Sequence, residues 1–246
     1  MKFAPADLTL DAFLNGRVML HQPRVGYRAA TDPVLLAAAT EAQAGQKVLD
    51  VGCGAGTAAL CLAARVPGLE LHGLEMQAEY AALAQSNAPD MTVWAGDLFD
   101  APPDLKEIGF DWVITNPPFF ESAATAAPND GRDKARREAA GADLWVSAAL
   151  RRVRSGGRIA VIHLAEQLPH ILAGLKGAGD IAVLPLQSRI GRAAKRVIVT
   201  ARKGAKGPFR LAPAFVLHEG ERHLRDEVDF SIEAQAVLRD GEPLRF

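Results

Sequence analysis

The tetrapeptide at residues 116–119, Asn-Pro-Pro-Phe, is the segment whose residue types are best suited to hold a planar amino group. It follows an apolar run, residues 112–115, that is typical of a buried strand. Pro117 keeps Asn116 out of the helical region and fixes its own φ, so the segment should be rigid and extended. The Asn116 side-chain oxygen and the Pro117 carbonyl would then accept both hydrogens of an –NH₂ group, while Phe119 offers a flat surface for a base. We predict a catalytic group of Asn116, Pro117, Pro118 and Phe119, although a tetrapeptide alone could also be a proline-rich turn.

A second chemical feature is the glycine-rich loop at residues 50–57, Asp-Val-Gly-Cys-Gly-Ala-Gly-Thr. Glycines in such a loop let the backbone turn sharply and approach a ligand. The loop does not fit the dinucleotide fingerprint, because the third glycine position falls on Thr57, and it lacks the Lys-Ser/Thr of a Walker A loop. Asp50 would repel a pyrophosphate and suit a cation such as the ammonium group of an amino acid.

Two further acids follow the next predicted strands. Glu75 ends the second strand, where an acid accepts hydrogen bonds from ribose hydroxyls, and Asp97 follows the third, where it can meet an adenine edge. A ligand with a ribose, an adenine and a cationic amino-acid tail is S-adenosylmethionine. The residues therefore predict that cofactor and an in-line methyl transfer to an amino nitrogen. Solvated acids beside unrelated turn glycines are the plainer alternative.

Strands and helices must alternate along the chain to place these residues together. The predicted strands cover residues 47–51, 69–74, 91–94, 112–115, 158–163, 181–187 and 195–201, with a further short one at 215–217. The predicted helices cover residues 33–42, 57–65, 76–86, 138–153, 165–176 and 231–238. This order predicts an α/β, Rossmann-like fold: a seven-stranded, mostly parallel sheet with an antiparallel edge hairpin and helices on both faces.

We expect one domain over residues 1–246, in which residues 45–246 form the core and residues 1–44 close over the cofactor. The first thirty residues should be irregular, and Asp32 and Pro33 should start the first helix as N-cap and first helical residue. The loop at residues 121–134 is long for a compact domain, which is typical of a functional or mobile loop.

The composition, about half apolar with an ordinary charged fraction, fits a folded protein with a sizeable core. The net charge is −1, and no apolar stretch approaches the roughly 20 residues that span a bilayer. The N-terminus lacks the basic start and apolar run of a signal peptide, so we expect a cytoplasmic protein. Cys53 and Cys61 do not suggest a disulfide, and the six histidines show no ligand spacing, so we propose no metal.

Basic residues gather in two stretches despite the near-neutral total. Residues 189–210 hold eight Lys or Arg and no acid, and residues 132–137 hold four more basic residues. Clustered positive charge of this kind predicts contact with nucleic-acid phosphates, whereas a solvated sheet edge is the alternative. The predicted substrate-binding residues are Phe120, Arg136, Arg137, Arg189, Arg192, Lys195 and Arg196.

Residues 50–56 and 116–119 resemble the amino-group methyltransferases of class I Rossmann-like fold. The segment at residues 22–37, with Gln-Pro, Gly-Tyr-Arg and Thr-Asp-Pro-Val-Leu-Leu-Ala, narrows the resemblance to the bacterial tRNA1(Val) adenine-37 N6-methyltransferase family. Many relatives carry Tyr where this chain has Phe119. The alternatives left open are the same chemistry on ribosomal RNA guanine N2, DNA adenine or protein glutamine, and a non-catalytic module that binds cofactor or RNA.

The resemblance implies a tRNA partner, and we expect no membrane contact and a monomer or weak dimer. It also implies that Tyr27, Arg28 and Thr31 close over the methionine end of the cofactor. The remaining cofactor contacts are assigned to Asp50, Gly52, Gly54, Glu75, Met76, Asp97, Leu98 and Asn116.

Overall fold

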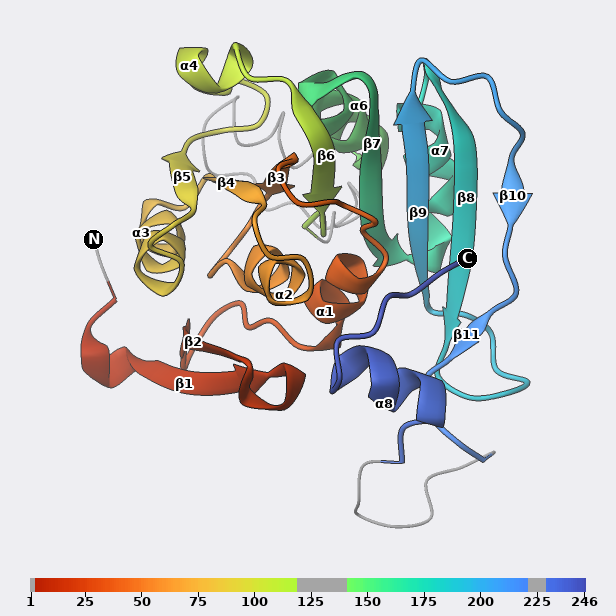
Figure 1. Ribbon diagram of the computed structural model, residues 1–246, viewed down its shortest axis with the longest axis horizontal. Coiled ribbons are helices and arrows are strands. Elements are labelled where there is room, and N and C mark those ends of the chain that lie inside the picture. The colour runs from red at the N-terminus through yellow and green to blue at the C-terminus, as the bar shows by residue number, and fades with distance from the viewer. Residues whose placement is uncertain (1–2, 119–140, 221–228) are drawn as a thin grey trace, which may run out of the picture.

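A computed structural model describes residues 3–118, 141–220 and 229–246 and contains one large sheet (Figure 1). Its strands are β3 (Lys47–Val51), β4 (Glu70–Glu75), β5 (Thr92–Ala95), β6 (Phe110–Thr115), β7 (Val153–Leu164), β8 (Ala178–Gln187), β9 (Arg196–Lys203), β10 (Arg210–Leu211) and β11 (Phe215–Val216). They pair in the order β10-β8-β9-β7-β6-β3-β4-β5, and β11 also pairs with β8. Of these strands only β9 runs against the others, so the predicted mostly parallel sheet is confirmed.

The rim of the sheet beyond β9 differs from the prediction. Strands β8 and β9 form the expected antiparallel hairpin, but β10 and β11 pair in parallel with the outer side of β8. The described sheet therefore has nine strands, not seven, and β8 does not end it. A strand of two residues is too short to show a hydrophobic periodicity in the sequence. The pairing of β10 and β11 instead depends on the chain packing against β8.

The expectation of irregular structure before residue 30 is wrong. Strands β1 (Leu8–Phe13) and β2 (Val18–Pro23) form an antiparallel hairpin. Its turn contains Asn15 and Gly16 with φ values of 53° and 82°, which is the conformation that Asn-Gly adopts readily. The Asn-Gly pair between two alternating segments was therefore an available hairpin signal.

Helices cover both faces of the large sheet, as predicted (Figure 1). They are α1 (Thr31–Ala38), α2 (Thr57–Arg65), α3 (Ala78–Asn87), α4 (Pro103–Lys106), α6 (Ala142–Arg152), α7 (Leu168–Gly174) and α8 (Ile232–Leu238). Residues of α1, α2 and α8 pack on one face of the sheet, and residues of α6 and α7 pack on the other. Side chains alternate along the strands, so Val48 and Ile114 belong to the first core and Leu49 and Val113 to the second.

Helix α1 begins two residues earlier than predicted, and Asp32 is not its N-cap. Ala30 is the N-cap and Thr31 the first helical residue, and no side chain caps the helix. Asp32 instead forms an ion pair with Arg196 at the start of β9, with 3.0 Å between Oδ2 and Nε. The predicted loop at residues 121–134 and the first residues of the helix predicted at 138–153 lie outside the described residues. Within the described ranges, no helix is long and apolar enough to cross a membrane.

Candidate active site

The predicted site residues meet at the carboxyl edge of the sheet. Val51 pairs with Leu74 on one side and with Thr115 on the other, and Thr115 pairs with Val161. The residues that follow β3, β4 and β6 are therefore neighbours across adjacent strands. In open α/β sheets this edge is where ligands bind.

Asp50 is a buried carboxylate whose second oxygen has no protein partner. The residue is 3% exposed, and Oδ2 makes no hydrogen bond to the described residues. Burial raises the pKa of Asp50 to about 7, and the charge of Glu75 adds to the shift, while a hydrogen bond from the Ala59 backbone opposes it. An oxygen in this state fits a ligand that brings a positive charge or a hydrogen-bond donor.

Glu75 holds the glycine loop against the end of β4. Its Oε2 accepts from the Gly54 backbone N–H at 3.0 Å, and its Oε1 accepts from the Gln77 N–H at 2.9 Å. Each carboxylate oxygen can accept a second hydrogen bond, so the two oxygens of Glu75 can still accept from ribose hydroxyls. Gly52 and Gly54 have φ values of 70° and 53°, which other residues rarely adopt, and this explains the loop glycines.

Asp97 and Leu98 follow β5 at the same edge. The Asp97 Oδ1 accepts from the Phe99 N–H at 3.0 Å, which orders the turn after the strand. Leu98 is buried, whereas Met76 after β4 is exposed. Met76 thus lies next to Glu75, and Leu98 lies next to Asp97. The contacts of Met76 and Leu98 with the cofactor, which the resemblance implies, stay a prediction.

Trp145 and Phe99 are site residues that the sequence analysis missed. Trp145, on α6, donates from Nε1 to the Thr115 hydroxyl at 3.0 Å, and a Cβ added to Gly52 would meet its ring at 3.4 Å. Its ring and that of Phe99 meet edge to face with centroids 6.2 Å apart. No local signal marks Trp145, because only the packing of α6 brings it to the loop.

Tyr27 links the N-terminal segment to the tetrapeptide. A Cβ added to Gly54 would meet its ring at 3.5 Å, its carbonyl accepts from the Tyr80 hydroxyl at 3.1 Å, and the Asn116 side chain lies near its hydroxyl. Partial burial raises the pKa of Tyr27, and the charges of Asp32 and Asp50 add to the shift. The structure therefore brings Tyr27 and Asn116 together over the glycine loop.

The other two residues assigned to the methionine end are placed differently. The Arg28 guanidinium pairs with Asp11 at 2.6 Å and donates to Thr9 and to the Pro23 carbonyl at 2.8 Å. These contacts attach it to the β1–β2 hairpin, and its role at the cofactor stays a prediction. Thr31 is half-buried at the start of α1.

The tetrapeptide is described up to its third residue. Asn116 is half-buried, Pro117 is buried and Pro118 is exposed, directly after β6. The predicted residues Phe119, Phe120, Arg136 and Arg137 lie outside the described residues.

The basic stretch at residues 189–210 does not form one surface. Arg189 pairs with Asp229 and Arg196 pairs with Asp32, so both predicted phosphate ligands are engaged in ion pairs. Strand β9 also separates Arg196 from Arg202 by about 20 Å, at 3.4 Å per residue. Arg192 and Lys195 are exposed and lie between β8 and β9, at the same edge as Asn116.

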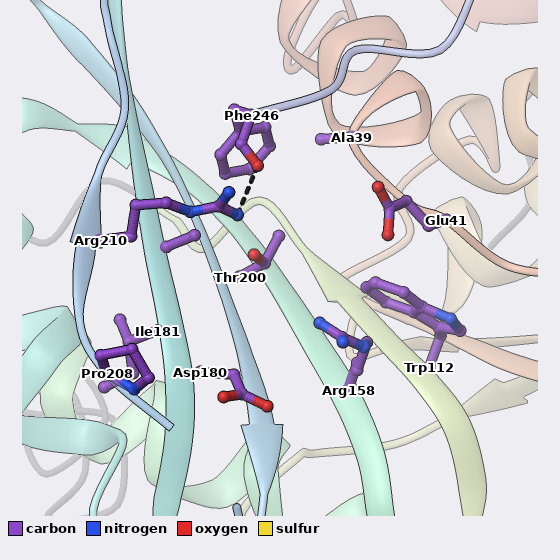
Figure 2. A pocket seen from close by; sticks show the side chains of 11 residues that line it. Ala39, Glu41, Trp112, Arg158, Asp180, Ile181, Thr200, Pro208, Arg210 and Phe246 are labelled. Atoms are coloured by element: carbon purple, nitrogen blue, oxygen red, sulfur yellow. Dashed lines mark hydrogen bonds between the residues drawn. The ribbon is translucent and has the colours of Figure 1, made fainter. Parts of the chain in front are cut away.

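One hollow among the described residues lies away from these site residues. It has a volume of about 390 Å³ and is open between the sheet and the C-terminal tail (Figure 2). Arg210 donates to the Phe246 carbonyl at 2.5 Å above it, and Arg158 lies over the Trp112 ring at 6.0 Å. None of the predicted site residues lines this hollow. Arg158 pairs with Trp112 and Arg202 toward the amino edge of the sheet, so the hollow is separate from the loop and tetrapeptide.

A family model described as the methyltransferase small domain matches residues 29–171, more than half of the chain. The chain belongs to the methyltransferase small domain family. The matched region contains the glycine loop, the three acids and the tetrapeptide. The expectations of a methyltransferase and of S-adenosylmethionine as its cofactor are thereby confirmed, and the orphaned Asp50 oxygen fits the cationic tail of that cofactor.

This methyltransferase small domain protein is similar to curated proteins named tRNA1(Val) (adenine(37)-N6)-methyltransferase. The protein from Yersinia pestis is 28% identical over 197 residues, which covers 74% of this chain and 77% of that protein. The protein from Yersinia enterocolitica is 35% identical over 120 residues, which covers 46% of this chain and 47% of that one. The predicted resemblance is confirmed.

Solved structures support the fold. A predicted O-methyltransferase from Agrobacterium tumefaciens superposes with a TM-score of 0.69 at 21% identity and covers 87% of this chain and 98% of its own. A T. thermophilus 16S rRNA N2 methyltransferase, solved with AdoMet and guanosine, gives 0.55 at 21% identity, covering 80% of this chain and 50% of its own. At this identity the likeness concerns the fold, and it confirms the predicted class I methyltransferase architecture.

Proposed function

We propose that this protein methylates the N6 amino group of an adenine in tRNA, with S-adenosylmethionine as the methyl donor. The observation that carries the proposal is the position of Asn116 and Pro117, directly after β6 and next to the glycine loop. The names of the curated relatives support adenine N6 and tRNA as the acceptor. The exposed Arg192 and Lys195 at the same edge support a nucleic-acid partner.

The cofactor would be held by the acids at the strand ends. Asp50 would take the ammonium group, Glu75 the ribose hydroxyls and the turn after Asp97 the adenine. When bound there, S-adenosylmethionine supplies an electrophilic methyl group. Trp145 and Tyr27 lie over the loop from two other elements and would exclude water from it.

The tetrapeptide would prepare the acceptor nitrogen. The Asn116 side-chain oxygen and the Pro117 carbonyl accept the two N–H groups and pull the aromatic amine toward a tetrahedral geometry. The lone pair of this nitrogen would then be directed toward the methyl group that S-adenosylmethionine supplies, and the methylated nitrogen would lose its proton to water. Positioning supplies most of the rate, so a strong general base is not required.

The proposal also covers the domain organisation, the cellular location and the residues of the site. We infer one methyltransferase domain over residues 1–246, acting in the cytoplasm as a monomer or weak dimer. The catalytic group is Asn116, Pro117, Pro118 and Phe119, and the substrate contacts are Phe120, Arg136, Arg137, Arg192 and Lys195. Arg189 and Arg196 are left out because each is held in an ion pair.

The proposal is tested with labelled S-adenosylmethionine and total tRNA from a strain that lacks the gene. Nucleoside analysis of the product should show label in N6-methyladenosine. Label in N2-methylguanosine of ribosomal RNA, in DNA adenine or in protein glutamine would show the same chemistry on another acceptor and overturn the tRNA assignment. Cofactor binding without transfer to any of these acceptors would indicate a non-catalytic module.

A further inference from the structure

The glycine loop and the Asn-Pro-Pro segment, residues 116–118, leave neighbouring strands at the same level of the sheet. Val51, the last residue of β3, pairs with Thr115, the last residue of β6. One residue further along, Gly52 enters the loop and Asn116 begins the segment. The distance between a methyl donor held by the loop and an amine held by the segment therefore depends on how these two strand ends are fixed to each other.

The Thr115 side chain joins the two strand ends. It is fully buried, and its hydroxyl donates to the Val51 carbonyl at 2.8 Å. A hydroxyl that donates its one hydrogen can still accept on its lone pairs. The Trp145 indole, on α6, uses this capacity: its Nε1–H donates to the Thr115 Oγ1 at 3.0 Å. An indole N–H can only donate and a carbonyl can only accept, so both hydrogen bonds have a fixed direction, from Trp145 through Thr115 to Val51.

The Trp145 ring also packs against the glycine loop. A Cβ added to Gly52 would meet the ring at 3.4 Å, so the ring lies on the bare backbone of that residue. The same ring meets Phe99, in the turn after β5, edge to face with centroids 6.2 Å apart. Helix α6 is fixed to the sheet by its own buried residues, among them Ala142 and Val146. One side chain on a packed helix thus contacts residues that follow β3 and β5 and is hydrogen-bonded to the last residue of β6.

We propose that the Trp145–Thr115 pair positions the methyl donor against the acceptor amine by fixing the glycine loop and the Asn-Pro-Pro segment to each other. The inference rests on the proposed function, in which the loop holds the cofactor and Asn116 holds the amine. Thr115 is fully buried, so it acts through Asn116, its neighbour in the chain, and is a positioning residue. The pair should affect the rate of transfer more than the affinity for the cofactor, whose polar groups would be held by Asp50 and Glu75.

The test compares Thr115→Val with Thr115→Ser and with the matched variant Thr40→Val. Valine keeps the shape of threonine without the hydroxyl, whereas serine keeps the hydroxyl. Thr40 is a second fully buried threonine, and its hydroxyl donates to the Leu36 carbonyl of α1 at 2.8 Å. Its neighbours Ala39 and Glu41 line the hollow toward the amino edge of the sheet, so Thr40→Val loses the same kind of hydrogen bond away from the loop and the segment.

We expect Thr115→Val to lower the single-turnover rate of transfer about 10- to 100-fold, because misplacement by about 1 Å costs up to about 100-fold. Its dissociation constant for S-adenosylmethionine should stay within about 3-fold of the wild type, which is under about 1 kcal/mol. Thr115→Ser should recover most of the rate, and Thr40→Val should keep it. A purely structural loss would instead lower the rates of both valine variants alike.

Trp145→Phe tests the other member of the pair, because it removes the indole N–H and keeps an aromatic ring beside the loop. This variant alone should lower the rate about 10-fold, and a rate equal to that of the wild type would overturn the inference even if Thr115→Val does not fold. Residues that act through one hydrogen bond are not additive. The double variant Thr115→Val with Trp145→Phe should therefore lose no more rate than the more damaging single variant. Losses that multiply would mean that the two residues act independently, which would also overturn the inference.

Equal rates in Thr115→Val and Thr40→Val, or no rescue by serine, would overturn the inference, while transfer by the wild type keeps the proposed function. A wild type that transfers to none of the acceptors would overturn both. NMR of the Trp145 indole gives a readout that is independent of activity. Its Nε1–H proton should lie further downfield in the wild type and in Thr115→Ser than in Thr115→Val, and an unchanged resonance in Thr115→Val would contradict the hydrogen bond.

Discussion

At the carboxyl edge of the sheet, acidic residues are placed to bind the cofactor and Asn116 is placed to orient the acceptor amine. Asp50 offers a buried oxygen without a partner, and Glu75 accepts a hydrogen bond from Gly54 of the loop with one oxygen and from Gln77 after β4 with the other. Asn116 offers an amide at the end of a segment that two prolines keep extended. The first two residues therefore bear on the affinity for the cofactor, and the third on the rate of transfer.

Cofactor binding should release a proton from Asp50. The pKa of Asp50 is about 7 in the free protein, so the carboxyl is largely protonated below pH 7 and must ionise to meet an ammonium group. The affinity for S-adenosylmethionine should therefore fall as the pH drops below 7, by up to about 10-fold per pH unit. Calorimetry at pH 7 in two buffers of different ionisation enthalpy measures the released proton. Asp50→Asn should bind more weakly at pH 8 and lose this pH dependence, and an unchanged dependence would contradict the role of Asp50.

Asn116→Ala should abolish transfer and spare cofactor binding. It removes one of the two acceptors that activate the amine, and the loss of one such preorganised group costs about 100- to 1000-fold in rate. Transfer is measured with labelled cofactor and tRNA, and cofactor affinity by calorimetry. A variant that loses both would show that Asn116 holds the cofactor instead.

At the scale of elements, the glycine loop depends on the strand beneath it. Cys53 in the loop is buried against Gly73 in the middle of β4, and a Cβ added to Gly73 would meet the Cys53 sulfur at 2.8 Å. The loop and β4 are also joined by hydrogen bonds from the Gly52 and Cys53 N–H groups to the Leu74 carbonyl. The shape of the loop is thus set by β4 as well as by its own glycines.

Gly73→Ala should displace the loop and weaken cofactor binding. The Met91 side chain at 3.1 Å closes the other side, so the added methyl overpacks the site and should cost about 1–3 kcal/mol in the free energy of unfolding. Denaturant unfolding and cofactor titration measure the two effects. Gly177→Ala is the control: its new Cβ meets nothing within 4 Å, so it should cost only the strain of its φ of 87°, about 1–2 kcal/mol, and leave affinity unchanged. Equal affinities in the two variants would argue against the coupling of the loop to β4.

At the scale of the whole molecule, basic residues that are close in sequence lie at opposite edges of the sheet. Arg192 and Lys195 lie between β8 and β9 at the edge that holds Asn116, whereas Lys203 donates to the Val153 carbonyl at the other end. The near-neutral total charge therefore does not prevent a local positive surface at the site.

The double variant Arg192→Glu with Lys195→Glu should weaken tRNA binding and flatten its dependence on salt. Each lost phosphate contact reduces the slope of log K against log salt by about 0.7–0.9. The matched control is Lys176→Glu with Lys206→Glu, two exposed residues toward the opposite edge with the same change of charge. Binding at several salt concentrations measures the slope. A similar loss in both double variants would mean that total charge, and not this edge, governs binding.

The sequence alone determined the local chemistry and the alternation of elements. Proline geometry, loop glycines and the acids after successive strands are properties of short segments, so they indicated the cofactor, the amino-group chemistry and the parallel sheet. Helix α2 was predicted with the bounds that the structure shows. The β1–β2 hairpin was also readable, since Asn15 and Gly16 carry its turn in the sequence.

Only the tertiary structure decided which side chains meet across elements. The pairing of Arg196 with Asp32 and the placement of Trp145 on the loop join segments far apart in the chain. Such contacts depend on strand order and register, which no local periodicity specifies. Basic residues that are close in sequence also lie at opposite ends of β9. An extended strand rises about 3.4 Å per residue, so a few residues separate the two groups widely.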